Sequence, residues 1–151
     1  MSESTGTLLE KEAVIDTLNR LFISVDDRDW AAARECLAPR VLFDVSSMSG
    51  EAASTLAADE IIRAWEGALE PLEAVHHQAG NYRVEIKGSE ADAFCYGIAY
   101  HYLPNSSGEN TRLFVGSYDF HLQKSGACWV IDHFKYNLKF IEGNLELEAI
   151  D

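Results

Sequence analysis

Asp26 and the adjacent pair His76 and His77 are the residues whose types best suit acid–base chemistry in this sequence. An imidazole can exchange a proton near neutral pH. Neighbouring residues of a strand face opposite sides, so only one of the two histidines can point into an interior pocket. Each histidine can equally be a hydrogen-bonded structural residue, and both interpretations remain open on the residues alone.

Asp26 directly follows an apolar helical pattern, in the run VDDRDW at 25–30. A carboxylate at the C-terminal end of a helix opposes the helix dipole, so it is mildly unfavourable there unless another interaction requires it. The alternative is that Asp26 and Asp27 form a solvated turn in which Asp29 caps the next helix.

The three cysteines are widely spaced among apolar neighbours, which indicates reduced core thiols rather than a disulfide framework. No CxxC, HxxxH or HExxH spacing occurs, so the sequence predicts no metal site.

The elements that must position these groups can be read from periodicity. Apolar residues recur at helical spacing in 8–25 and 59–69, and a short helix is expected at 30–37 before Pro39. A brief strand is expected at 40–45, followed by a polar loop. Short polar turns then separate four long predicted strands: 74–86, 91–103, 111–123 and 128–140. Helices followed by an antiparallel meander predict an α+β fold, in which the sheet covers its apolar face with the helices and encloses a pocket.

Alternation within the strands predicts which side chains face that pocket. In 91–103 the bulky face, with Phe94, Tyr96, Ile98, Tyr100 and Tyr102, is expected to line the interior, and Cys95, Gly97, Ala99 and His101 to face outward. Buried phenols need hydrogen-bond partners, so the tyrosines are either paired core residues or donors to a ligand. The side chains expected to contact a ligand are Phe22, Trp65, Tyr96, Tyr100, Phe114, Tyr118, Phe134 and Tyr136.

Three segments resemble the SnoaL-like, or nuclear transport factor two-like, superfamily: VDDRDW after an amphipathic helix, HHQAGN at 76–81 at the start of a strand, and GACWVI at 126–131. Similar members include scytalone dehydratase, bile-acid 7α-dehydratase and hexachlorocyclohexane dehydrochlorinase. The resemblance covers nearly the whole chain. It implies a cone-shaped, curved mixed or antiparallel sheet wrapped around three N-terminal helices, as in cystatin-like folds.

The same resemblance implies the site. An aspartate and a histidine form the catalytic dyad of those enzymes, and their positions fall on Asp26 and His77, with His77 as the base and Asp26 orienting it. Tyr118 corresponds to a polar position of the family's pocket. Val25 stands where scytalone dehydratase has a tyrosine. The second histidine of that enzyme is not assigned to His101, because the alternation turns His101 outward.

The function implied is that of a cofactor-independent lyase or isomerase, of the dehydratase or dehydrohalogenase type. Its substrate would be a hydrophobic polyketide, steroid, terpenoid or aromatic compound, and neither a metal nor an organic cofactor is required. The alternative is a non-catalytic ligand-binding or dimerisation domain of the same fold.

The net charge restricts the possible partners, and the length restricts the number of domains. With 12 basic and 25 acidic residues, the net charge of −13 disfavours nucleic acid and anionic membranes and favours a neutral ligand. The sequence shows neither a signal peptide nor a membrane-length apolar run, so a cytoplasmic protein is expected. One domain is expected over 1–151, with 1–7 and 143–151 as flexible ends; the acidic tail either caps the pocket mouth or lies in solvent.

The outer face of the sheet is predicted to be mixed rather than polar, which favours a homodimer or higher homo-oligomer through that face. Its expected residues are Cys95, Ala99, Ser117, Asp119, His121, Ile131 and His133.

Overall fold

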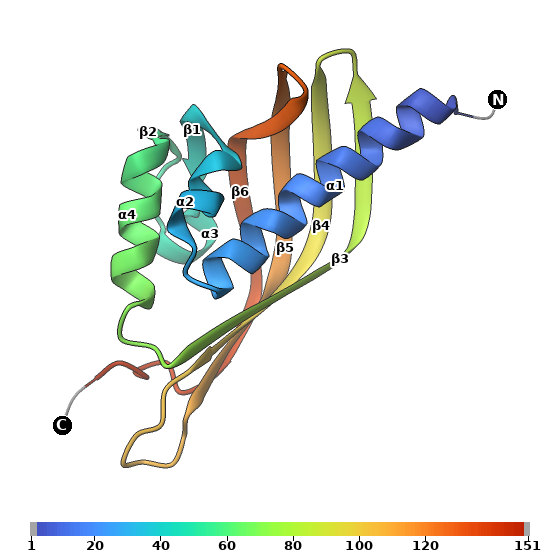
Figure 1. The fold of residues 1–151 in the computed structure, drawn as a ribbon. Helices are drawn as coiled ribbons and strands as arrows, with labels where there is room; N and C mark the ends of the chain where they lie inside the picture. The colour runs from blue at the N-terminus through green and yellow to red at the C-terminus, as the bar shows by residue number, and fades with distance from the viewer. Residues whose placement is uncertain (1–2, 150–151) are drawn as a thin grey trace.

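The computed structural model describes residues 3–149 and consists of helices packed on one curved, open sheet of six strands (Figure 1). The strand order is β2-β1-β6-β5-β4-β3, and every neighbouring pair is antiparallel except β1 with β6. The prediction of an α+β fold with a mixed sheet and N-terminal helices is therefore confirmed. Residues 1–2 and 150–151, which belong to the two ends expected to be flexible, lie outside the described residues.

The helices begin where the sequence offers capping side chains. Helix α1 (Thr5–Asp26) starts after Ser4, whose hydroxyl accepts a hydrogen bond from the Thr7 amide, and so begins earlier than the expected residue 8. Helix α2 (Trp30–Glu35) is capped by Asp29, as expected. Helix α4 (Ala58–Leu69) matches its prediction within a residue, whereas the four-residue helix α3 (Ser46–Ser49) lies in the segment expected to be a loop.

The four long strands of the meander follow the predicted order: β3 (Ala74–Lys87), β4 (Glu90–Tyr102), β5 (Thr111–Ser125) and β6 (Cys128–Gly143). Strand β1 (Leu37–Asp44) begins three residues before its predicted start. Strand β2 (Ser54–Ala57) was not predicted, because four residues are too few to reveal an alternation.

The core lies between α1 and the concave face of the sheet (Figure 1). Val14, Leu18, Leu21, Phe22 and Val25 form the buried stripe of α1, at the three- and four-residue spacing that the sequence predicts. Helices α2 and α4 cover the part of the sheet near β1 (Figure 1). Within residues 3–149, none of the helices combines the length and apolar composition that a membrane crossing requires.

The predicted orientation of β4 is wrong. Tyr96 and Tyr100 are each 45% exposed on the outer face, whereas Cys95 and Ala99 are buried. Small side chains face inward because a large ring from β5 lies across them: a Cβ atom on Gly97 would lie 2.2 Å from Cε2 of Tyr118. The same reversal places Phe94, Ile98 and Tyr102 on the outer face and turns His101 toward the interior.

The predicted outer face also fails at Ile131, which is fully buried. Between the pairs His121–His133 and Leu122–Ile131, β6 contains one additional residue, Asp132. Such a bulge shifts the in-and-out alternation of side chains by one position. An alternation extended from His133 back to Ile131 therefore places Ile131 on the wrong face of the sheet.

The close approach of Tyr118 to β4 makes Gly97 a structural requirement. Gly97→Ala is expected to lower the free energy of unfolding by about 1 to 3 kcal/mol, because the ring must move within a packed aromatic cluster. Gly80→Ala on β3 is the matched control, since no atom lies within 4 Å of the position that an added methyl group would take there. Urea unfolding of the three proteins measures the difference; equal midpoints for the two variants would contradict this account of the β4 orientation.

Candidate active site

Asp26 and His77 meet where the end of α1 packs against the start of β3. The Asp26 carboxylate accepts two hydrogen bonds from His77: Oδ2 from the backbone amide at 2.7 Å, and Oδ1 from the ring Nδ1 at 2.6 Å. Both side chains are largely buried, at 15% and 17% exposure. Phe22, one turn earlier on α1, stacks on the imidazole with ring centroids 5.6 Å apart. The position and the ring plane of His77 are thus fixed from two sides.

The carboxylate also fixes where the His77 ring carries its proton. An ionised carboxylate only accepts hydrogen bonds, so the neutral ring must carry its hydrogen on Nδ1. The lone pair then lies on Nε2, on the opposite side of the ring from Asp26. His76, the other member of the pair, is exposed.

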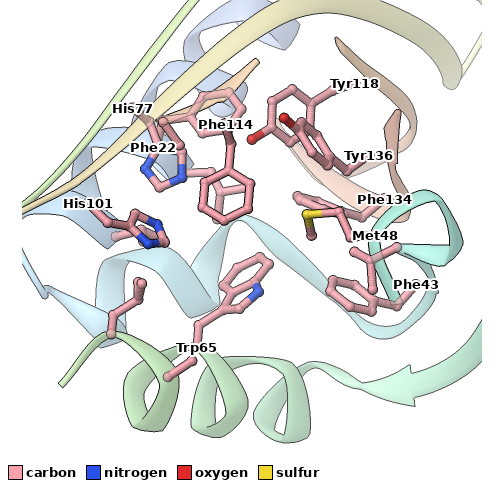
Figure 2. A pocket seen from close by; sticks show the side chains of 16 residues that line it. Phe22, Phe43, Met48, Trp65, His77, His101, Phe114, Tyr118, Phe134 and Tyr136 are labelled. Atoms are coloured by element: carbon pink, nitrogen blue, oxygen red, sulfur yellow. The ribbon is translucent and has the colours of Figure 1, made fainter. Parts of the chain in front are cut away.

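A cavity of about 250 Å³ lies beside the His77 ring. Its lining is almost entirely apolar and comes from α1, β1, α3, α4 and the inner faces of the long strands (Figure 2). Asp26 is not part of the lining: it lies behind His77. An apolar surround strengthens hydrogen bonds and charge interactions made inside it.

Seven of the predicted site residues line this cavity: Phe22, Trp65, His77, Phe114, Tyr118, Phe134 and Tyr136. Tyr96 and Tyr100 do not, since they lie on the outer face of the sheet. Phe43, Val45 and Met48 also line the cavity and were not expected there. The brief alternation of 40–45 predicts a strand but not that it borders the pocket, and Met48 lies in the segment expected to be a loop.

His101 is the second imidazole of the cavity, and it was wrongly assigned to the outside. Val75 pairs with His101 and His77 with Ala99, so the two histidines are diagonal neighbours on the inner face (Figure 2). Nη2 of Arg112 lies 2.8 Å from Nδ1 of His101. Burial, followed by the positive charge of Arg112, lowers the pKa of His101 to about 4. The ring is therefore neutral at physiological pH.

Two phenols stand on the wall formed by β5 and β6. The rings of Tyr118 and Tyr136 have centroids 4.9 Å apart, and both are labelled in the cavity in Figure 2. The Tyr136 hydroxyl is buried and has no hydrogen-bond partner among residues 3–149. Burial raises the pKa of Tyr136 to about 12 and moves the pKa of Tyr118 further upward, so both remain protonated donors. Within the same residues, no group of three or more His, Cys, Asp and Glu side chains could hold a metal ion.

The family model of the SnoaL-like domain matches residues 6–135 of the sequence. The chain belongs to the SnoaL-like domain family. The matched region runs from the second residue of α1 through β5 to the middle of β6, and it thus contains Asp26, His77 and His101. Comparison with curated proteins gives no match.

Solved structures share the fold of this SnoaL-like chain over nearly its whole length. The Kfla4162 protein from Kribbella flavida superposes with a TM-score of 0.88 at 20% identity, covering 94% of this chain and 98% of that one. A candidate scytalone dehydratase from Novosphingobium aromaticivorans gives 0.80 at 13%, covering 91% and 89%. Hexachlorocyclohexane dehydrochlorinase LinA-type3 from Novosphingobium barchaimii gives 0.73 at 13%, covering 96% and 97%. At these identities the likeness establishes the nuclear transport factor two-like cone fold and no more.

Proposed function

We propose that this SnoaL-like chain is a cofactor-independent lyase or isomerase, in which His77 removes a proton from carbon and Asp26 orients His77. The observation that carries the proposal is the hydrogen bond of 2.6 Å between Asp26 and Nδ1 of His77 on the wall of an apolar cavity. Two structural neighbours, one named as a dehydratase and one as a dehydrochlorinase, agree with elimination chemistry.

The proposed step begins with Nε2 of His77 accepting a proton from a C–H bond next to a carbonyl group. The bonding pair moves toward the carbonyl and forms an enolate, while Asp26 stabilises the imidazolium. In this proposal His101 and the Tyr118 hydroxyl, both on the cavity wall, donate hydrogen bonds to the enolate oxygen. In a dehydration the enolate then expels a β-hydroxyl group, which takes the proton from His77 and leaves as water. In an isomerisation His77 returns the proton to another carbon.

The cavity supports a small, neutral substrate. Its volume of about 250 Å³ is below the range of about 300 to 1,000 Å³ that is usual for drug-sized ligands. One- and two-ring aromatic or polyketide compounds fit this size better than a four-ring steroid. The residues that line it offer imidazole and phenol groups but no Lys or Arg, and the nearby Arg112 is paired with Glu148. A strongly anionic substrate is thus disfavoured.

Exchange of acidic C–H protons for deuterium tests the proposed base without knowledge of the natural substrate. One- and two-ring ketones in D₂O are expected to exchange faster with the protein than with buffer, as followed by NMR. His77→Gln is expected to lower the protein-catalysed rate by about 10²- to 10⁴-fold, because it removes the base. Asp26→Asn is expected to lower it as well, because the amide no longer enforces the tautomer of His77.

His76→Gln is the matched control, since it changes the exposed neighbour on the same strand and should leave the rate unchanged. Circular dichroism establishes that each variant is folded. Equal exchange rates for the wild type and folded His77→Gln would exclude His77 as the base. Ligand binding in the cavity without exchange or turnover for any ketone would favour the non-catalytic binding domain instead.

We further propose that the chain forms a homodimer or higher oligomer through the outer face of the sheet. Ile98, Val115 and Phe140 are aligned across β4, β5 and β6 on that face, flanked by the exposed rings of Tyr96 and Tyr100. This row replaces the apolar residues first expected there, because Cys95, Ala99 and Ile131 are buried. A contiguous apolar row with Ile98 and Phe140 exposed and Val115 partly exposed favours association.

Light scattering after size-exclusion chromatography tests this surface. The wild type is expected to elute as a dimer or larger oligomer at moderate salt, which screens the repulsion of two acidic chains. Ile98→Lys is expected to shift the mass to the monomer, whereas Ile23→Lys, at an exposed isoleucine on α1, is not. A monomeric wild type over a wide concentration range would rule out the oligomer.

A further inference from the structure

Arg112 is a largely buried cation beside the cavity. It lies on β5 directly opposite His101 on β4, with its side chain only 13% exposed and its guanidinium 5.4 Å from the centroid of the Phe114 ring. Burying a charge is costly unless it is paired and hydrogen-bonded. The structure must therefore supply Arg112 with partners.

The partner carboxylate comes from the segment that follows β6, residues 144–149. Nη1 of Arg112 donates to Oε2 of Glu148 at 2.8 Å, and Nη2 donates to Oε1, so the pair is bidentate. The hydrogen bond with Arg112 lowers the pKa of Glu148. Leu147, the preceding residue, is 1% exposed in the core, and the Asn144 amide donates to the Thr111 carbonyl at 2.8 Å. This part of the acidic tail is packed against the domain and holds Glu148 in place.

The arginine in turn determines the tautomer of His101. A guanidinium group has five N–H donors and no acceptor, so its contact of 2.8 Å with Nδ1 of His101 requires a lone pair on that nitrogen. The hydrogen of the neutral ring must then be on Nε2. This is the opposite of His77, whose Nδ1 contacts a carboxylate and whose Nε2 therefore carries the lone pair. One imidazole of the cavity accepts a hydrogen bond and the other donates one.

We propose that Glu148 and Arg112 are positioning residues: Glu148 holds Arg112, and Arg112 holds His101 as a neutral Nε2–H donor toward the ligand. The segment 144–149 thereby contributes to the site although it does not line the cavity. The use of that donor on a substrate oxygen rests on the proposed function, whereas the position of the proton on His101 does not.

The charged and titratable groups around His101 are Arg112 on β5, His77 on β3, Glu148 in the tail and Asp26 on α1. Burial, Arg112 and His77 lower the pKa of His101, and Glu148 and Asp26 raise it. With a pKa of about 4, His101 does not become an imidazolium in the physiological range. Removal of the arginine charge would bring protonation of His101 closer to neutral pH.

Long-range ¹H–¹⁵N NMR of protein labelled at histidine nitrogens tests the proposal without a substrate. In the wild type, His101 is expected to show a protonated Nε2, an unprotonated Nδ1 and a titration midpoint near 4. Arg112→Met should abolish the tautomer preference and raise the midpoint by about 1 unit, while burial, the larger cause, still holds the pKa of His101 below its ordinary value. Glu148→Gln should weaken the preference, because Arg112 loses its carboxylate. Glu146→Gln, an equal charge change on the same segment, should leave the spectrum unchanged.

Unchanged His101 nitrogen shifts in folded Glu148→Gln, or a wild-type proton on Nδ1, would overturn the proposal. If Arg112→Met does not fold, Arg112→Lys keeps the charge but loses the planar fork, and should still weaken the tautomer preference. Once a substrate is found, Glu148→Gln is expected to lower kcat more than it raises KM. If the variants change the His101 nitrogen shifts as expected but no substrate is turned over, the proposed function is refuted and this inference stands.

Discussion

The Asp26 carboxylate is the constraint on which the site depends. It ends a helix of 22 residues, where the helix dipole disfavours a negative charge, and it is compensated by the two N–H groups of one residue on β3. Each hydrogen bond to an ionised group is stronger than a neutral one, and partial burial increases the effect. The same contacts join α1 to the sheet edge and set the tautomer of His77. The hydrogen bonds that hold α1 against β3 are therefore the same ones that orient the His77 ring.

The two imidazoles of the cavity differ in what contacts their Nδ1 atoms. A carboxylate at His77 leaves a lone pair on Nε2, and a guanidinium at His101 leaves a hydrogen there. Each partner is itself held: Asp26 by the His77 amide, and Arg112 by Glu148. Which ring nitrogen donates and which accepts is therefore fixed in both histidines before a ligand binds. Such preorganised donors and acceptors are most effective in an apolar surround, which the aromatic and aliphatic lining of the cavity provides here.

Sequence periodicity was sufficient for the helices, the long strands and the α+β class, because these elements bury one face over many residues. It failed where local geometry breaks the period. The bulge at Asp132 reverses the alternation of β6, and the large Tyr118 ring occupies the space that the bulky face of β4 was expected to fill. His101 was assigned to the wrong face for that second reason. The spacing of small residues opposite an aromatic strand, as at Gly97, is the signal that could have indicated the inner face.

The protonation state of His77 at mildly alkaline pH, where an ordinary imidazole is neutral, tests the central claim most directly. Because Asp26 contacts Nδ1, the long-range ¹H–¹⁵N spectrum should show a hydrogen on Nδ1 of His77 and an unprotonated Nε2, and Asp26→Asn should lose this preference. A hydrogen on Nε2, or a tautomer that does not respond to the loss of the carboxylate, would contradict it.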